Sequence, residues 1–250
     1  MDDAEHELAR QCYGYGRWDA PYWFIGLEEG QAPWENNDFS QRAEAFRKLN
    51  RDGLCDCLRF HKEIGECRWH AANRKSGKIN LQSTWKYLIL LLMAFQDGRK
   101  LTDEEKRRDL QEVYQSSRWG MEDKGVGETC VIELSGLPAN SSEVSRKRSE
   151  ETRKLLKDVL PTRIERIQKG IIESEPKFVL MYGITAKEHW TRIADFPLQA
   201  DIPRKIGRTT YLLARHPAAR FKGQKKDQYW VQLGTELREE SSRSRVSEQR

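Results

Sequence analysis

The sequence predicts an α/β fold, with a doubly wound, mostly parallel four-stranded sheet flanked by helices. Residues 21–27, 129–135, 177–183 and 209–215 are nearly continuous apolar runs rich in β-branched and aromatic residues. Such runs are typical of strands buried on both faces. Helical patterns occupy residues 38–49, 82–95, 102–115, 150–172 and 185–194. Strands that alternate with helices in this way indicate a doubly wound sheet.

Two capping boxes and one proline define the expected helix boundaries. Thr102 with Glu105 and Thr185 with Glu188 can satisfy reciprocal backbone donors at a helix start. Pro161 lacks an N–H and crowds the preceding turn, so we expect it to break or kink the helix over residues 150–172.

The length of 250 residues suits one substantial core. We expect a single domain over residues 1–235, with a helical insertion around residues 50–120. Residues 236–250 alternate charged residues with serine and are expected to form a flexible tail.

Composition restricts the class of partner and the compartment. The 44 Lys and Arg against 39 Asp and Glu leave a net charge of +5, which suits an anionic partner without proving one. The longest apolar run, residues 87–95, is too short to span a bilayer, so we expect a cytoplasmic protein without a membrane partner. Five cysteines, an odd number, favour reduced thiols over a disulfide framework.

The residues that follow the predicted strands carry most of the functional information. In open α/β sheets, ligands bind beyond the carboxyl ends of the strands. GLEEG (26–30) follows the first strand, IELSGLP (132–138) spans the end of the second, and ARHPAAR (214–220) follows the fourth. Acidic side chains and an imidazole are therefore expected at one edge of the sheet.

In this order and at these strand ends, the three motifs resemble those of the uracil-DNA glycosylase superfamily, over roughly residues 20–222. That family carries a glycine-bounded catalytic loop, a base-reading strand and a His-Pro loop after its last strand. The resemblance implies a metal-independent hydrolase that binds DNA, flips out a base and cleaves its N-glycosidic bond, leaving an abasic site. It implies neither a cofactor nor an obligate protein partner.

Cleavage of an N-glycosidic bond develops positive charge on the sugar and negative charge on the departing base. By the family pattern, Glu28 orients the attacking water and stabilises the sugar cation, although most members have Asp or Asn there. His216 donates a hydrogen bond to O2 of the base. A solvated loop carboxylate and a structural histidine are the alternatives. Glu29 replaces the usual proline and is expected to be exposed.

The predicted base-binding residues indicate which base is removed. Glu133 stands where uracil-specific enzymes place Asn; a carboxylate repels O4 of uracil but accepts from N4 of cytosine, and if protonated it also donates to N3. Gly30 leaves space for a C5 substituent, and Gly26 and Leu27 belong to the same loop. Together they favour a 5-modified cytosine, such as the glucosylated hydroxymethylcytosine of phage DNA, and hence a role in defence. A structural role for Glu133, and uracil as the substrate in base excision repair, are alternatives.

Aromatic and basic residues complete the predicted DNA-binding surface. Trp34 and Phe39 are candidates to stack on the base, or else belong to the core. Arg220 matches the wedge position of relatives with HPxxR, or is an ordinary exposed or phosphate-binding arginine. A phosphate-tracking patch, or simply solvated charge, is expected from the basic residues around the last strand: Arg204, Lys205, Arg208, Lys222, Lys225 and Lys226.

Cys55, Cys57, Cys67 and His70 lie close together, with His61 between them. Some relatives hold an iron–sulfur cluster, but their cysteines have a different spacing. Cys-x-Cys followed at a distance by one further cysteine is not a standard zinc pattern either. We therefore expect free thiols and no metal, with a metal site as the alternative.

Two other classes of protein compete with a glycosylase. A catalytically inactive member of the fold that binds modified DNA, or acts as an adaptor, would retain the same loops. A nucleotide-binding Rossmann-like enzyme ranks lower, because no GxGxxG follows the first strand and no Walker loop occurs.

Overall fold

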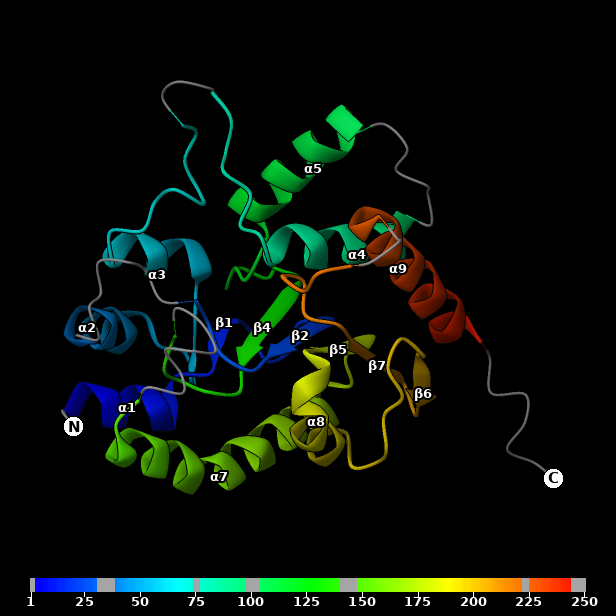
Figure 1. Ribbon diagram of the computed structural model, residues 1–250. Coiled ribbons are helices and arrows are strands. Elements are labelled where there is room, and N and C mark those ends of the chain that lie inside the picture. The colour runs from blue at the N-terminus through cyan, green and yellow to red at the C-terminus, as the bar shows by residue number, and fades with distance from the viewer. Residues whose placement is uncertain are drawn as a thin grey trace.

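The computed structural model describes residues 3–30, 39–73, 77–97, 104–139, 148–221 and 225–243. A central sheet lies between two layers of helices (Figure 1). Its strands are β1 (Gly14–Gly16), β2 (Tyr22–Gly26), β3 (Leu54–Cys55), β4 (Thr129–Glu133), β5 (Phe178–Tyr182), β6 (Arg204–Ile206) and β7 (Thr209–Ala214). The helices are α1 (Asp3–Gln11), α2 (Ser40–Leu49), α3 (Cys57–Glu63), α4 (Trp85–Asp97), α5 (Glu104–Ser117), α7 (Glu150–Ser174), η1 (Ile184–Ala186), α8 (Lys187–Ala194) and α9 (Lys226–Ser242).

All four predicted strands are confirmed as β2, β4, β5 and β7, and they are mutually parallel. They lie side by side in the order β4-β2-β5-β7, so the chain passes from β2 to β4 and then crosses to the other side of β2. Gly26 pairs with Glu133, and Tyr182 pairs with Ala214. The carboxyl ends of the four strands therefore share one edge of the sheet.

The sheet has seven strands instead of the predicted four, in the order β3-β1-β4-β2-β5-β7-β6. The three extra strands are two or three residues long, too short for a hydrophobic pattern to reveal them. β1 pairs antiparallel with β4, with Gly14 opposite Ile132 and Gly16 opposite Cys130. A Cβ at Gly14, where φ is +135°, would lie 2.1 Å from the carbonyl oxygen of Val131. Only glycine fits there.

Alternate residues of the central strands enter two different cores. Tyr22 and Phe24 of β2 belong to the core under α4 and α9, whereas Trp23 and Ile25 belong to the core formed with α7 and α8. This burial on both faces explains why the strands are continuous apolar runs. Because α4 packs in the first core, the segment expected as an insertion contributes directly to the domain's interior.

Several helix predictions need correction. α7 runs unbroken through Pro161, because its apolar face is buried against the sheet and that packing outweighs one lost hydrogen bond. Thr185 does not cap a helix: it lies inside η1, and Ala186 precedes α8 without a side-chain cap. Thr102 is outside the described residues.

The expected flexible tail is wrong for its first part. α9 continues to Ser242, because Leu233 and Leu237 are buried against the core. Among the described residues, every helix is either too short or too polar to cross a lipid bilayer.

Candidate active site

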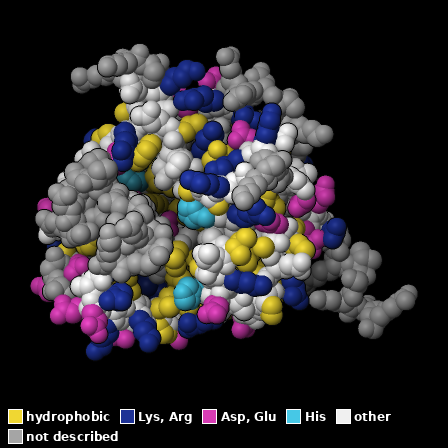
Figure 2. All heavy atoms as spheres, in the orientation of Figure 1, with side chains coloured by type: hydrophobic (Ala, Val, Ile, Leu, Met, Phe, Trp, Pro, Cys, Tyr) yellow, Lys and Arg dark blue, Asp and Glu magenta, His cyan; other side chains and the backbone are white. Residues whose placement is uncertain are grey.

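A cavity of about 650 Å³ opens at the carboxyl edge of the parallel strands. Leu27, Glu28, Glu133 and His216 all line it, so three loops far apart in the sequence converge there. Figure 2 shows this face as a hollow with histidine and hydrophobic side chains, and Lys and Arg side chains nearby. The prediction that these residues lie at one edge of the sheet is therefore confirmed; their chemical roles stay predictions.

Backbone hydrogen bonds hold the loops after β2 and β4 together beyond the end of the sheet. Leu134 N donates to Gly26 O at 2.8 Å, and Ser135 N donates to Leu27 O at 2.7 Å. Ala139 N donates to Glu29 O at 2.8 Å. The peptide groups around Glu28 are therefore fixed relative to Glu133.

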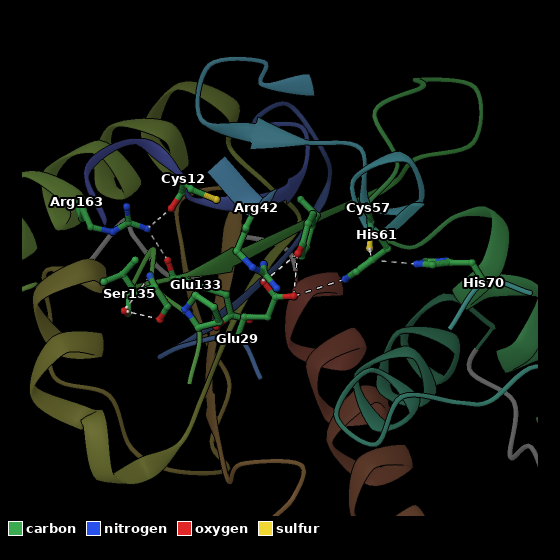
Figure 3. Close-up of polar contacts among 12 residues, drawn as sticks. Cys12, Glu29, Arg42, Cys57, His61, His70, Glu133, Ser135 and Arg163 are labelled. Carbon is green, nitrogen blue, oxygen red and sulfur yellow. Dashed lines mark hydrogen bonds and ion pairs between the residues drawn. The ribbon is translucent and has the colours of Figure 1, made fainter. Parts of the chain in front are cut away.

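Buried Arg163 of α7 also fixes the backbone at the end of β4. Its guanidinium donates to the carbonyl oxygens of Glu133 at 2.8 Å and Leu134 at 2.7 Å, and also to those of Ala9 and Cys12 (Figure 3). Carbonyls that β4 leaves unpaired at its end are thus satisfied inside the protein. Sequence analysis did not identify this arginine, because its position in the middle of a helix carries no local signal.

Glu28 lies on the cavity wall with its carboxylate 3.2 Å from Nη2 of Arg148. The same nitrogen donates to the carbonyl oxygens of Leu137 and Pro138. Arg148 therefore links the loop after β2 with the loop after β4. This partner was also missed, since it lies far from Glu28 in the sequence.

Glu133 is a buried carboxyl group with one described partner. Tyr182 Oη donates to Oε1 at 3.2 Å, while Oε2 has no hydrogen-bond partner among the described residues. Burial raises the pKa of Glu133 well above its ordinary value, and the nearby charge of Glu29 raises the pKa further. We call Glu133 and Tyr182 the Glu133 pair. The raised pKa favours the neutral form of its carboxyl, and Oε2 is a buried oxygen without a hydrogen-bond partner among the described residues.

Gly26 is required beside the Glu133 pair. A Cβ at this position would lie 2.3 Å from Tyr182 Oη and 2.6 Å from Glu133 Oε2. Glycine therefore leaves the space in which the two side chains meet. Gly30, by contrast, has no described atom within 4 Å of a Cβ built on it, and residues 31–38, which follow it, lie outside the described residues.

His216 is held in one tautomer by its own loop. Ala218 N donates to Nδ1 at 3.0 Å, so the proton of the neutral ring must be on Nε2. Burial lowers the pKa of His216, and Lys226 nearby lowers the pKa further. The ring thus stays neutral at neutral pH and can present an N–H donor to the cavity.

Glu29 is not the freely exposed side chain that the sequence led us to expect. Its carboxylate accepts from Tyr15 Oη at 2.8 and 2.9 Å and from Arg42 Nη1 at 2.8 Å, and His61 Nε2 lies 3.6 Å away. Burial raises the pKa of Glu29, but Arg42, His61 and Tyr15 outweigh it and lower the pKa to about 2. We call these four residues the Glu29 cluster (Figure 3).

The aromatic residues of the cavity differ from those predicted. Phe39 is buried in the core next to α2 and does not line the cavity, so its assignment to base stacking is wrong. Trp34 lies outside the described residues. Trp69, Trp85 and Tyr182 line the cavity instead. These three residues are far apart in the sequence, so the sequence alone does not predict that they line one cavity.

The predicted phosphate patch is dispersed. Arg208 pairs with Glu175 at the amino ends of the strands, away from the cavity. Arg204 stacks on Phe196, and Lys205 donates to the backbone at the end of α9. These three residues therefore have local partners instead of forming one surface with the cavity.

Nearer the cavity, Arg220 is exposed and follows the cavity-lining Ala218 and Ala219. Lys226 Nζ donates to Pro217 O in the His216 loop. Lys225 immediately precedes α9, and Lys222 lies outside the described residues.

None of the five cysteines forms a disulfide bond, which agrees with the expected absence of a disulfide framework. Cys57, His61 and His70 converge beside the cavity, whereas Cys55 and Cys67 are not part of this group. Burial and the neighbouring His61 lower the pKa of His70 to about 3, so its ring is neutral. Cys57, His61 and His70 therefore lie together although their spacing in the sequence matches no standard zinc pattern.

Comparisons of the chain with models of known protein families and with curated proteins find no match.

Proposed function

We propose that this protein is a monofunctional DNA glycosylase that hydrolyses the N-glycosidic bond of a flipped-out base, most favourably a 5-modified cytosine. One observation supports this function above all others: Glu28, Glu133 and His216 line one cavity. Its volume of about 650 Å³ is within the usual range for small-molecule sites, and a nucleoside is a ligand of that size.

The chemistry assigned to each side chain follows from its surroundings. Glu28 supplies a carboxylate for the sugar cation and the attacking water, and Arg148 positions it. His216 carries its proton on Nε2 and so offers a donor for the negative charge that develops on the base. An anion and a neutral donor in one cavity are the two groups that this bond cleavage needs.

Glu133 supports a cytosine-type base in its neutral form. A protonated carboxyl provides one donor for N3 and one acceptor for the N4 amino group. The same neutral group can also pair with O4 and N3–H of uracil, so its charge does not by itself exclude uracil. The preference for a modified cytosine rests additionally on Gly30, since no described atom lies within 4 Å of a Cβ built there and a C5 substituent could use that space.

The direct test incubates the purified chain with oligonucleotides that each carry one cytosine, hydroxymethylcytosine, glucosylated hydroxymethylcytosine or uracil. Abasic sites are scored as alkali-sensitive strand breaks. We expect the fastest cleavage on a 5-modified cytosine, and a fall of about 10²–10³-fold for Glu28→Gln. Glu188→Gln makes the same change at an exposed position of α8 and serves as the control. Binding without abasic sites on any substrate would instead favour the inactive DNA-binding alternative.

A second variant tests the space for the C5 substituent. Gly30→Tyr places a ring where glycine leaves room, and overpacking of this kind typically costs about 1–3 kcal/mol. We expect cleavage of the glucosylated base to fall by about 10-fold or more, while cleavage of the smallest accepted base changes little. Equal losses on both bases would remove Gly30 from the base-binding set.

A further inference from the structure

The side chains of Cys57, His61 and His70 bring three metal-binding atoms together at the start of the insertion. Cys57 and His61 are four residues apart on α3, so both project from one face of the helix. His70 follows in a turn in which its N–H donates to Cys67 O at 3.0 Å. Cys57 and His61 are buried and His70 is half-buried.

The two distances from His61 Nδ1 to the other ligand atoms are close to those that a zinc ion imposes on its ligands. His61 Nδ1 lies 3.4 Å from Cys57 Sγ and 3.1 Å from His70 Nε2. All three atoms lie within 4.8 Å of one another. With Zn–N bonds of about 2.0 Å and a Zn–S bond of about 2.3 Å, a tetrahedral site needs N···S and N···N separations of about 3.5 and 3.3 Å.

The other nitrogen of His61 has the partner that a metal-bound histidine usually has. His61 Nε2 faces Glu29 Oε1 at 3.6 Å (Figure 3). A carboxylate there holds the proton on Nε2 and leaves the lone pair of Nδ1 directed at Cys57 and His70. Glu29 itself accepts hydrogen bonds from Tyr15 and Arg42, so its carboxylate has a fixed position that orients the His61 ring.

We propose that Cys57, His61 and His70 form a zinc site, with the fourth tetrahedral position taken by water. One thiolate and two imidazoles are a donor set that Zn²⁺ binds well. The thiol proton of Cys57 passes to solvent as the Zn–S bond forms. The ion joins α3 to the turn at His70. It also fixes the position of His61, and through His61 the carboxylate of Glu29, which is adjacent to Glu28 in the sequence.

The test measures zinc in the full-length chain by mass spectrometry, before and after incubation with Zn²⁺ and dialysis. We expect about one zinc per chain in the wild-type protein. Cys57→Ser and His70→Ala should lose it, whereas Cys67→Ser, which removes an exposed cysteine nearby, should keep it. Glu29→Gln should weaken zinc binding by about 10–100-fold, because the His61 ring loses its carboxylate partner.

Cobalt decides the question even if the ligand variants do not fold. Co²⁺ added to the metal-free wild-type protein should produce a thiolate-to-cobalt charge-transfer band, which added Zn²⁺ abolishes. Absence of this band, or equal loss of zinc in Cys67→Ser and Cys57→Ser, would overturn the site. Neither measurement uses DNA cleavage, so the result is independent of the glycosylase assignment.

Discussion

The Glu29 cluster and the Glu133 pair lie at the ends of the neighbouring strands β2 and β4, yet their carboxyl groups differ in charge. Glu29 has hydrogen bonds from Tyr15 and Arg42 and a third partner in His61, and its pKa is lowered to about 2. Among the described residues Glu133 accepts a hydrogen bond from Tyr182 alone, and burial raises the pKa of Glu133. The number and charge of partners, more than burial, therefore separates the two acids.

The comparison also separates a structural role from a ligand-binding role. Both oxygens of Glu29 are used by the protein, whereas Oε2 of Glu133 has no partner among the described residues. A buried polar atom without a partner is costly unless a ligand or water pairs with it. We therefore expect changes at Glu29 to affect stability first, and changes at Glu133 to affect the choice of base and the pH profile.

The largest effect is expected from Glu29→Gln. This change removes the carboxylate that lies 2.8 Å from the buried guanidinium of Arg42, which should lower the free energy of unfolding by about 3 kcal/mol. Urea denaturation measures the loss. Glu63→Gln breaks the exposed pair with Lys48 and should cost less than about 1 kcal/mol. Similar losses in both variants would mean that the Glu29 cluster is no more than a surface ion pair.

Gly26→Ala should destabilise the protein by about 2 kcal/mol, because the new Cβ enters the space of Tyr182 Oη and Glu133 Oε2. It should also separate the Glu133 pair and slow base excision. Gly30→Ala is the matched control, since its Cβ has no described atom within 4 Å. Thermal unfolding compares the stability of the two variants, and cleavage rates compare Gly26→Ala with the wild-type protein. If Gly26→Ala is as stable as Gly30→Ala, the close packing around the Glu133 pair is not needed.

Tyr182→Phe should cost about 1 kcal/mol, since it removes the one described hydrogen bond to Glu133. Tyr182 lowers the pKa of Glu133, so its loss should raise that pKa further and extend cleavage activity to higher pH. Rates measured across the pH range for both proteins test this shift. A shift to lower pH would show that Tyr182 favours the neutral carboxyl instead.

The smallest change at neutral pH is expected from Glu133→Gln. The amide retains one donor and one acceptor, so the rate should change only a few-fold. In the wild-type protein the neutral carboxyl is lost as pH rises through the raised pKa of Glu133, and activity should fall with it. Glu133→Gln should abolish this alkaline fall. An unchanged fall would assign it to another group.

Glu133→Gln also tests how the raised pKa of Glu133 affects the pH dependence of the free energy of unfolding. The folded chain keeps a proton on Glu133 that the unfolded chain releases near 4.5, so wild-type stability should decrease as pH rises above that value toward the raised pKa. Glu133→Gln should lack this contribution to the pH dependence. Urea denaturation at several pH values measures the difference between the two proteins.

Glu133→Asn tests whether Glu133 determines the preference between cytosine-type bases and uracil. The shorter amide withdraws from the base edge and matches the residue expected in uracil-specific enzymes. We expect the ratio of cytosine-type to uracil cleavage to shift toward uracil by about 1–3 kcal/mol. An unchanged ratio would remove Glu133 from the base-reading role while leaving its burial unexplained.

The sequence alone determined the four central strands and the loops that follow them, because continuous apolar runs report burial on both faces. It also located Glu28, Glu133 and His216 at strand ends, and parallel strands necessarily bring such ends to one edge. These are local signals. They depend on the order of residues along the chain and on the geometry of a parallel sheet.

Only the tertiary structure decided the partners of these residues. Arg148, Arg163 and Tyr182 reach the site from separate elements, and nothing in their local sequence indicates it. The charge of Glu29 and of Glu133 likewise depends on which groups lie within a few ångströms in space. Electrostatic interactions and hydrogen bonds act through distance, and folding sets those distances between residues that the sequence keeps far apart.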